Sequence, residues 1–304
     1  MDNSLKFKAE SIKAYISRLE NDFQFVIIID DLYDILKHNN FANFKNIDAW
    51  RVNDYCLTIK SDRHLHRRCV NLKWSNVMDI LDMRDDAYEL NCYLGVREYI
   101  VPIKVNNTHI CTVSASGYMG DINPKTALAV CHRLNITESE FYALRESALN
   151  PNYAIDKEKL KTYLMVLADM LKDYLKALPE TEKYTNKNEP QNQHLLKATN
   201  YIKQNCTKDI TVKDIADVCF VSLSYLQHIF SKYRHHGINE EITRERLQYA
   251  EALLLSTDRQ IKDIAYSSGF SNSDYFCTVF KKHYGISPLK YRKIKLTNKS
   301  KPYK

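Results

Sequence analysis

One stretch near the C-terminus, residues 253–293, constrains the fold more than any other part of the chain. Ile261, Ile264 and Ala265 recur at helical spacing, which gives a short helix one apolar face. Gly269 then interrupts the pattern, and glycine readily adopts the positive φ that a tight turn after a helix requires. The sequence therefore predicts a short helix that ends in a sharp turn.

A second short helix is expected directly after this turn. Its buried side should carry Tyr275, Phe276, Val279 and Phe280. Its outward side carries small polar residues, and its last turn carries cations: Ser273, Asp274, Cys277, Thr278, Lys281 and Lys282. Gly285 ends the helix, and Ser287 and Pro288 are typical of the cap and first position of another helix. Two short helices joined in this way are typical of a unit that reads the DNA major groove.

These residues, at these spacings, resemble the C-terminal DNA-binding module of the AraC/XylS family of bacterial transcription regulators. The resemblance rests on apolar positions, glycines, a proline, aromatics and cations: Ala250, Leu253, Leu254, Thr257, Ile261, Ile264, Ala265, Gly269, Phe270, Tyr275, Phe276, Phe280, Lys281, Lys282, Gly285, Ser287, Pro288, Tyr291 and Arg292. It implies an all-α C-terminal domain with two helix-turn-helix units, and double-stranded DNA as the partner.

The first of the two units is expected upstream, with Thr211 and Ser222 as helix caps. The expected helices cover residues 195–204, 212–219, 223–233 and 239–256, and the last of these links the two units. The sequence departs from the family pattern just before the linking helix. His235 stands where the family usually places Gly, Gly237 comes two residues later, and Glu241 stands where an aromatic is usual. The sequence therefore does not predict how the start of the linking helix packs.

Two copies of one unit should set two reader helices about one DNA turn apart, roughly 34 Å. Carried over by position, the family's base-contacting side chains are Ser224, Tyr225, Gln227 and His228 in the first reader and Ser273, Asp274, Cys277 and Thr278 in the second. Gln can pair with adenine, Asp accepts from cytosine, and Ser or Thr can pair with either kind of base. Neither reader offers an outward Arg, so we expect an A·T-leaning site with much shape readout. Lys281, Lys282 and Arg292 are candidates for phosphate contacts.

The distribution of charge also places the polyanion partner on the C-terminal part. Residues 191–304 hold 19 Lys and Arg against 10 Asp and Glu, whereas the rest of the chain holds 25 against 27. The longest apolar run, residues 25–29, is far too short to span a bilayer, and the N-terminus lacks a signal-peptide pattern. A cytoplasmic protein without a membrane partner is expected, and its eight cysteines are expected to be thiols.

The N-terminal part predicts an α+β domain. An amphipathic helix is expected over residues 5–23 and a buried central strand over residues 23–29. Strands over 97–105 and 108–116 flank Asn106-Asn107, which suits a two-residue hairpin turn. Pro102 indicates an unpaired or bulged strand edge, and Gly117 and Gly120 should end the second strand. The pattern indicates a PAS- or GAF-like sensor with a small mixed sheet and flanking helices.

Three helices are expected next, over residues 124–134, 138–148 and 156–178, the second with Thr137 and Glu140 in capping-box register. The third has a long apolar stripe, which serves either as core or as a homodimer contact. Residues 179–193 contain two prolines and almost no apolar side chains, which predicts a flexible linker. The expected organisation is a sensory and dimerisation domain over 1–178, a linker over 179–193 and a DNA-binding domain over 194–304.

Residues 91–103, together with the run from Ser114 to Tyr118, resemble the PocR-type sensory domain family. In this sequence and in that family, a strand of small residues follows a cysteine, a polar aromatic, a Gly and a Val-Pro-Ile strand. The resemblance implies a small-molecule sensor with its effector left open. The candidate ligand-binding residues are Cys56, Cys69, Cys92, Tyr93, Tyr99 and Tyr118.

The cysteines raise an alternative class of function. A thiol or metal sensor, or an alkylation-repair protein with a zinc-bound methyl-accepting cysteine, would use cysteines of the N-terminal part. Cys56, Cys69, Cys92 and Cys111 form no CxxC pair, so a zinc cluster is weakly supported and buried small hydrophobes are favoured. No catalytic motif, metal site or cofactor is predicted. The sequence thus predicts a DNA-binding regulator that is controlled by a small molecule. The resemblance to the family implies that it is an activator and that it contacts RNA polymerase. A regulator controlled only by protein partners is the third alternative.

Overall fold

The computed structural model describes residues 3–23, 25–41, 44, 46–47, 53–72, 86–185, 190–234 and 236–299. The chain divides into two compact units. The N-terminal unit comprises Met1–Tyr55 and Leu72–Leu196, and the C-terminal unit comprises Cys56–Asn71 and Lys197–Lys304. The segment 56–71 is part of the C-terminal unit, although the sequence assigned all of residues 1–178 to the sensory domain. Among the described residues, no helix is long and apolar enough to cross a membrane.

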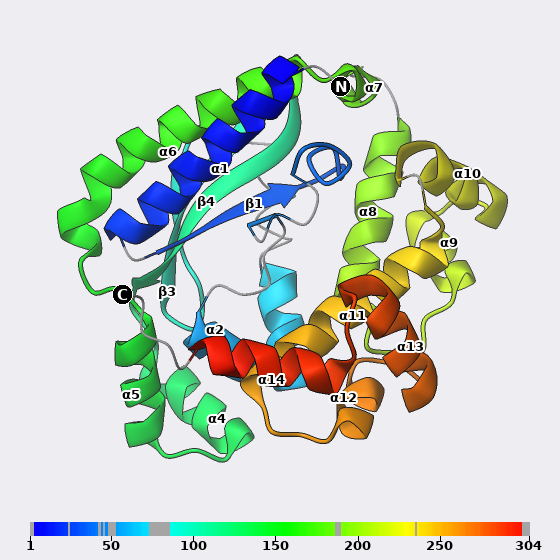
Figure 1. Cartoon of the computed structure of the whole chain (residues 1–304). Coiled ribbons are helices and arrows are strands. Elements are labelled where there is room, and N and C mark those ends of the chain that lie inside the picture. Colours follow the sequence, from blue (N-terminus) through cyan, green and yellow to red (C-terminus); the bar gives the residue numbers. More distant parts are fainter. Residues whose placement is uncertain are drawn as a thin grey trace. The chain divides into compact units, whose positions relative to one another are not determined.

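The N-terminal unit is built on a four-stranded antiparallel sheet with the order β1-β4-β3-β2 (Figure 1). Its strands are β1 (Val26–Asp31), β2 (Tyr88–Asn91), β3 (Val96–Val105) and β4 (Thr108–Met119). The predicted α+β class is confirmed, but the sheet is not the predicted mixed sheet, because its described strands pair only in the antiparallel direction. The prediction that the first strand is central is wrong, because β1 pairs with β4 at one end of this strand order. Its apolar residues are buried nevertheless, α1 packs against it, and Ile29 forms a parallel bridge with Ile47.

The hairpin between β3 and β4 follows the sequence closely. Asn106 and Asn107 adopt φ of 49° and 61°, as a tight two-residue turn requires. The pairing of β2 with β3 ends at Ile100, just before Pro102, and a register shift follows at Ile103. Gly117, with φ of 118°, does not end β4 but lies within it, where the register with β3 also shifts. The strand therefore continues to Met119.

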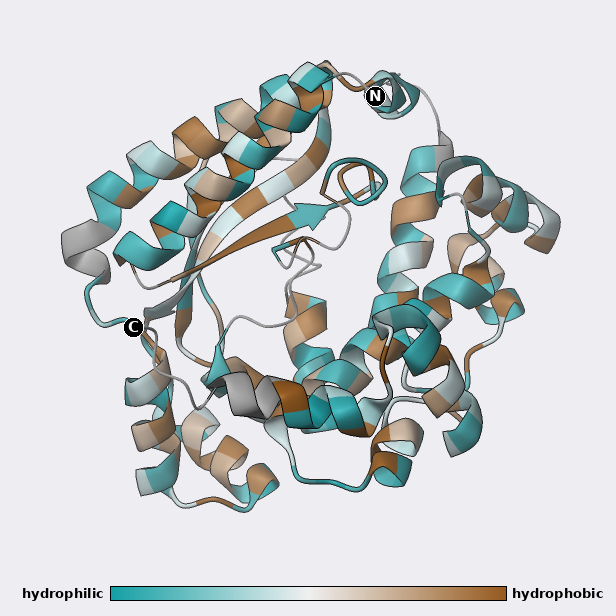
Figure 2. Cartoon of the chain, viewed as in Figure 1, coloured by the Kyte–Doolittle hydropathy of each residue, from teal (hydrophilic) through white to brown (hydrophobic). Residues whose placement is uncertain are grey.

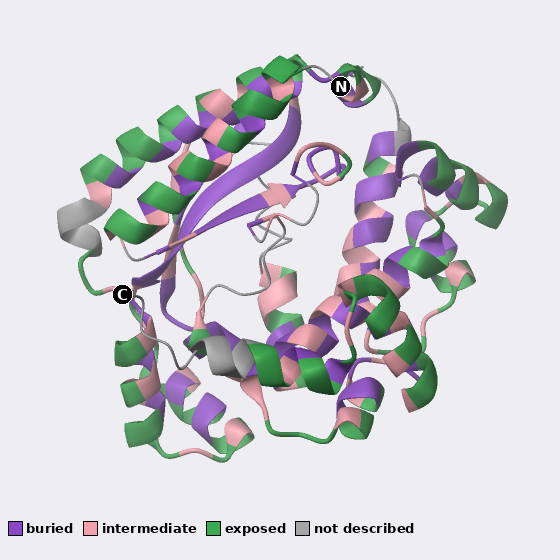
Figure 3. Cartoon of the chain, in the orientation of Figure 1, coloured by how far each residue is buried: buried purple, intermediate pink, exposed green. Residues whose placement is uncertain are grey.

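Two long helices, α1 (Asn3–Phe23) and α6 (Tyr153–Lys176), lie side by side over one face of the sheet (Figure 1). Their sheet-facing sides are apolar and buried, and their outer sides are exposed (Figures 2 and 3). The apolar stripe of α6 includes Leu160, Leu164, Leu167, Leu171 and Tyr174, all fully buried. The stripe is therefore core, and the homodimer stays a prediction.

The next helices of the N-terminal unit are α4 (Pro124–Leu134) and α5 (Glu138–Ala148), at the predicted bounds. The side chain of Asn123 caps α4. The predicted capping box of α5 is present, with Thr137 N donating to Glu140 Oε2 at 2.7 Å and Glu140 N donating to Thr137 Oγ1 at 3.2 Å. These boundaries follow local sequence signals because each cap satisfies backbone N–H groups of its own first turn.

Part of the predicted flexible linker is folded. A 3₁₀ turn (Pro179–Thr181) and α7 (Glu182–Thr185) pack on the N-terminal unit. Tyr184 stacks on Tyr33 with a centroid distance of 4.6 Å, and Thr181 Oγ1 donates to Leu175 O at 2.7 Å. The buried ring of Tyr184 thus anchors this polar segment to the N-terminal unit. The polar composition of the segment did not predict this contact.

The C-terminal unit is helical. It contains most of α2 (Asp54–Lys60), a helical segment over residues 63–71, and the following helices (Figure 1): α8 (Pro190–Asn205) from Lys197 onward, α9 (Val212–Cys219), α10 (Leu223–Arg234), α11 (Ile238–Ser256), α12 (Ile261–Ser267), α13 (Ser273–Tyr284) and α14 (Pro288–Lys299). The predicted all-α fold with two helix-turn-helix units is confirmed. The first predicted helix is longer than expected, because α8 begins at Pro190 rather than Leu195.

Candidate DNA interface

The first helix-turn-helix comprises α9 and α10. Thr211 caps α9, and its hydroxyl accepts from Asp214 N at 3.2 Å while Asp214 Oδ2 accepts from Thr211 N at 2.7 Å. These hydrogen bonds from the Thr211 backbone and hydroxyl hold the pKa of Asp214 below its usual value. Ser222 Oγ accepts from Tyr225 N at 3.2 Å and so caps α10. Between the helices, Phe220 adopts φ of 58° with its ring 88% exposed.

Helix α10 separates a buried side from a polar exposed side. Leu226, Ile229 and Phe230 are fully buried. The four predicted base-contacting residues lie on the other side, with Ser224, Gln227 and His228 exposed and Tyr225 half-buried. The helix therefore presents hydroxyl, amide and imidazole groups to solvent from its first two turns.

The second helix-turn-helix comprises α12 and α13, and its turn is tightly packed. Gly269 has φ of 90°, and a Cβ at this position would lie 2.6 Å from Cys206 O and 2.9 Å from Arg246 Nε. No other residue type fits there without a shift of backbone. Asn272 then caps α13, because its Oδ1 accepts from Asp274 N at 2.7 Å and from Tyr275 N at 3.0 Å. The sequence analysis had not identified this cap.

Helix α13 again has a buried side and a polar side. Phe276 and Phe280 are fully buried, but Tyr275 is 56% exposed, so its predicted burial is wrong. Of the predicted base-contacting residues, Asp274 and Thr278 are exposed, and Ser273 and Cys277 are half-buried. Thr278 Oγ1 donates to Asp274 O at 2.9 Å, which leaves its oxygen lone pairs as acceptors. Burial, and then the nearby Asp274 carboxylate, raise the pKa of Cys277, so this group is a neutral thiol.

The predicted phosphate contacts fall into two groups. Lys281 and Lys282 are exposed in the last turn of α13. Arg292 in α14 is half-buried, and its Nε donates to Leu254 O at 3.2 Å and its Nη2 to Arg259 O at 2.8 Å. Those carbonyls belong to the end of α11 and the loop after it. Arg292 therefore anchors α14 to α11, a role that the sequence did not indicate.

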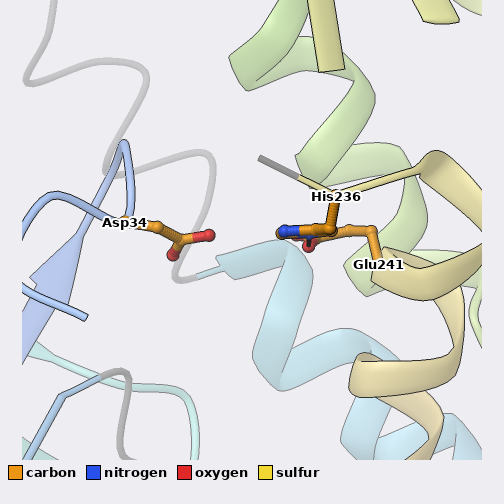
Figure 4. Close-up of side chains that lie close together, drawn as sticks. All are labelled: Asp34, His236 and Glu241. Atoms are coloured by element: carbon orange, nitrogen blue, oxygen red, sulfur yellow. Dashed lines mark hydrogen bonds and ion pairs between the residues drawn. The ribbon is translucent and has the colours of Figure 1, made fainter. Parts of the chain in front are cut away.

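At the start of α11, where the sequence departs from the family pattern, the structure has a glycine N-cap and a buried pair of polar side chains. Gly237 is the N-cap residue of α11, and His235 lies outside the described residues. Glu241 is 4% exposed, and its Oε2 lies 2.6 Å from Nε2 of His236, toward which it points (Figure 4). A buried carboxylate at this position is tolerated because the imidazole pairs with it.

Two arginines join the two helix-turn-helix units at one junction. Arg246 of α11 donates from Nε to Cys206 O at 2.7 Å and from Nη2 to Lys208 O at 2.9 Å. Arg63 donates from Nε to Ser267 O at 2.9 Å, and from Nη2 to Tyr266 O at 2.9 Å and to Thr207 O at 3.3 Å. We name the carbonyl-bearing stretches 206–208 and 266–267, together with these two guanidinium groups, the arginine junction. No sequence pattern had indicated Arg63.

The six predicted ligand-binding residues are divided between the two units. Cys56 and Cys69 belong to the C-terminal unit, and Cys92, Tyr93, Tyr99 and Tyr118 belong to the N-terminal unit. Tyr99 and Tyr118 are buried, and Tyr99 shares its sheet face with Glu89, which pairs with Lys157 of α6 at 2.6 Å. Tyr118 packs on Phe25 with a centroid distance of 5.9 Å. Cys92 and Tyr93 are half-buried in the turn before β3.

The opposite face of the sheet carries polar groups that sequence reasoning missed. The pairing register places Glu98 and Ser116 together, as it does Asp30 and Thr112, on the face that Tyr99 does not share. Ser114 Oγ donates to Glu98 Oε1 at 2.5 Å and Thr112 Oγ1 donates to Asp30 Oδ2 at 3.3 Å. The three hydroxyl residues are at most 3% exposed. We call this set the polar sheet face. The alternation of Thr112, Ser114 and Ser116 along β4 was the available signal.

Comparison with known proteins identifies the C-terminal part. Residues 215–294 match a helix-turn-helix domain family. The chain is 34% identical over 113 residues to the regulatory protein PocR of Salmonella typhimurium, which covers 37% of each chain. It is 34% identical over 94 residues to the melibiose operon regulatory protein of Escherichia coli, which covers 31% of each. It is 33% identical over 112 residues to the bifunctional transcriptional activator/DNA repair enzyme AdaA of Bacillus subtilis, which covers 37% of this chain and 53% of AdaA.

Solved structures match over the same share of the chain. The C-terminal domain of the response regulator yesN from Fusobacterium nucleatum is 31% identical, with 31% of this chain and 93% of that chain covered and a TM-score of 0.30. An AraC-type regulator from Chromobacterium violaceum is 25% identical, with 36% and 96% covered and a TM-score of 0.34. The matches to the curated relatives thus span only about a third to a half of the relatives' own length. The two helix-turn-helix units, the match over residues 215–294 and the similarity to these regulators together show that the C-terminal part of this chain is an AraC-type helix-turn-helix domain.

Proposed function

We propose that the protein reads two successive segments of the DNA major groove with α10 and α13. The observation that carries the proposal is that one unit contains two helix-turn-helix units, and that the second helix of each is capped and exposes small polar side chains from its first turns. Exposed donors and acceptors at the start of such a helix are the groups that read base edges. The lysines at the end of α13 suit phosphate contacts.

The exposed side chains define what each reader recognises. Gln227 suits a bidentate contact with adenine, and Asp274 suits the amino group of cytosine. The hydroxyl of Ser224 accepts or donates without strong preference, whereas the hydroxyl of Thr278 donates to Asp274 O and is left as an acceptor. Because the two readers offer no arginine among their exposed predicted contacts, strong guanine readout is absent from the proposal. The expected operator therefore leans toward A·T pairs.

Selection of binding sites from a random DNA pool with the full chain tests this reading. The expected consensus holds two elements about one helical turn apart. Gln227→Ala and Thr278→Ala should each relax the preference at positions within one element, by about 1–3 kcal/mol per lost base contact. Gln193→Ala, a neutral exposed residue of α8, is the matched control and should leave the consensus unchanged. A consensus dominated by G·C pairs would contradict the assignment.

We further propose that a small molecule binds the N-terminal unit and controls DNA binding. The polar sheet face supports a polar effector, because buried hydroxyl and half-buried carboxylate groups can hold hydroxyl or amino groups of a ligand by hydrogen bonds. The matched share of PocR and of the melibiose operon regulator supports control of transcription. Activation, contact with RNA polymerase and homodimerisation are part of the proposal.

A thermal-shift screen of the full chain against polar metabolites and divalent metals tests the sensor. A saturable rise in Tm with one compound class is expected, and Glu98→Gln should reduce it, because one acceptor of the polar sheet face is lost. The matched control is Glu158→Gln, an exposed carboxylate of α6. Stabilisation by zinc alone would favour the cysteine-based sensor or repair protein. No stabilisation by any compound would favour control by protein partners.

A further inference from the structure

The residue that carries a further inference is Arg63, which lies far from the DNA-binding helices in sequence but within the same compact unit. Asp62 Oδ1 accepts from His64 N at 3.0 Å and from Leu65 N at 2.9 Å, so Asp62 caps the helical segment 63–71. This cap fixes Arg63 in the first turn of that segment. The guanidinium group is thereby presented from a defined backbone position rather than from a loop.

The segment that carries Arg63 is anchored on the helix that links the two helix-turn-helix units. His66 packs against Tyr249 of α11 with a centroid distance of 4.4 Å, and both residues are almost fully buried. Burial lowers the pKa of His66 to about 3, so the ring is neutral at physiological pH. The segment and α11 therefore form one packed piece.

Arg63 bridges the approach to the first reader and the turn of the second. Tyr266 and Ser267 provide carbonyls at the end of α12 that accept from Arg63, and the Tyr266 carbonyl also accepts from Gly269 N at 3.1 Å. Thr207 lies in the loop that leads into α9. Arg246 holds the carbonyls on either side of Thr207 from α11, and Gly269 packs against one of them. One planar guanidinium group thus ties α12 to the loop before α9.

We propose that Arg63 is a positioning residue that fixes the orientation of α13 relative to α10, and so sets the spacing between the two DNA elements that the protein accepts. The proposal rests on the two-groove reading described above. The chain enters and leaves segment 56–71 from the N-terminal unit, at residues 55–56 and 71–72. Segment 56–71 is thus joined covalently to the N-terminal unit at both of its ends.

The test measures binding of the full chain to the selected operator and to two versions in which the spacer between the elements is one base pair longer or shorter. Wild type should bind the altered spacers at least about tenfold more weakly, which corresponds to about 1.4 kcal/mol. Arg63→Ala should lose most of this discrimination, because α13 can then reorient. Arg67→Ala removes the same charge from an exposed position of the same segment and should keep the discrimination.

Each outcome separates the two proposals. If wild type selects no DNA with two elements, the two-groove reading fails. If wild type discriminates between spacers and Arg63→Ala discriminates equally well, or binds every spacer more weakly by one common factor, Arg63 has no positioning role. Should Arg63→Ala fail to fold by circular dichroism, Arg63→Lys takes its place. Lysine keeps the charge but not the planar set of donors, so partial loss of spacer discrimination is expected. Wild-type discrimination in Arg63→Lys would then overturn the inference.

Discussion

At the scale of single residues, the two turn glycines of the second helix-turn-helix give a matched pair of predictions. Gly269→Ala meets both a positive φ and a close approach of its Cβ to Cys206 O, whereas Gly285→Ala meets a positive φ of 79° in open space. The strained φ alone should reduce the free energy of unfolding by about 1–2 kcal/mol. Gly269→Ala should lose clearly more, because the loop at residue 206 must shift. Urea denaturation of both variants measures the difference, and equal losses would contradict the packing described for Gly269.

A double-mutant cycle at His236 and Glu241 tests the pair that occupies the position where an aromatic was expected. Each side chain is at most 6% exposed, so removal of one partner leaves a buried polar group. His236→Ala and Glu241→Ala should each destabilise the protein, and their effects should fall short of additivity by about 1–3 kcal/mol. Unfolding free energies of the two single variants and the double variant give this coupling. Additive losses would mean that the two groups are held independently.

At the scale of elements, the capping box of α9 predicts a loss of stability in Thr211→Ala of about 1 kcal/mol. Thr162→Ala in α6 removes an exposed helix-interior hydroxyl and is the matched control, with no loss expected because Ala favours helix. DNA affinity should fall with Thr211→Ala as well, since α9 supports α10. Thermal unfolding and anisotropy measurements check the two effects.

The same box predicts a pH dependence. The pKa of Asp214 is lowered in the folded protein, chiefly by the backbone N–H of Thr211. Its contribution to stability is therefore fully present above the unfolded pKa of about 3.9 and is lost as the pH falls through the lower folded value. NMR titration of the Asp214 carboxyl should give a midpoint below the usual value for an aspartate. In Thr211→Ala the Asp214 midpoint should rise toward the usual value.

Helices and their caps were predictable from the sequence because their signals are local. The bounds of α4, α5, α9 and α10 follow from Asn, Thr and Ser caps and from apolar spacing within one or two turns. The position of β1 in the sheet was not predictable, because burial by helices and burial between strands give the same apolar run. Tyr275 was wrongly predicted to be buried, because the apolar face expected for the second helix was one residue too wide. Thr112 and Ser114 were not predicted as site residues, because small hydroxyl side chains in a strand give no local signal that separates a binding face from ordinary packing.

At the scale of the whole molecule, the salt dependence of DNA binding tests the phosphate contacts. If Lys281 and Lys282 each neutralise one phosphate, the double variant to alanine should reduce the slope of log K against log salt by about 2. Lys159→Ala/Lys161→Ala, two exposed lysines of α6, is the matched control and should leave the slope unchanged. An unchanged slope in the Lys281/Lys282 variant would place the phosphate contacts elsewhere.

The membership of segment 56–71 in the C-terminal unit predicts that a fragment over residues 194–304 is less stable than the same residues in the full chain. Such a fragment lacks the His66 contact with Tyr249 and the Arg63 hydrogen bonds to Tyr266 and Ser267. Hydrogen exchange should be faster around Tyr249 and at the end of α12 in the fragment. Equal protection in both proteins would mean that segment 56–71 contributes little to the unit.

The discontinuous C-terminal unit also has a consequence for synthesis on the ribosome. Arg63 and Ser267 are 204 residues apart in the chain, so the partners of segment 56–71 emerge only near the end of translation. His66, which is almost fully buried in the finished protein, likewise lacks its packing partner Tyr249 until α11 is made. A nascent chain that ends before α11 therefore exposes His66 and leaves Arg63 without its carbonyl partners, and incompletely packed segments of this kind are prone to aggregate.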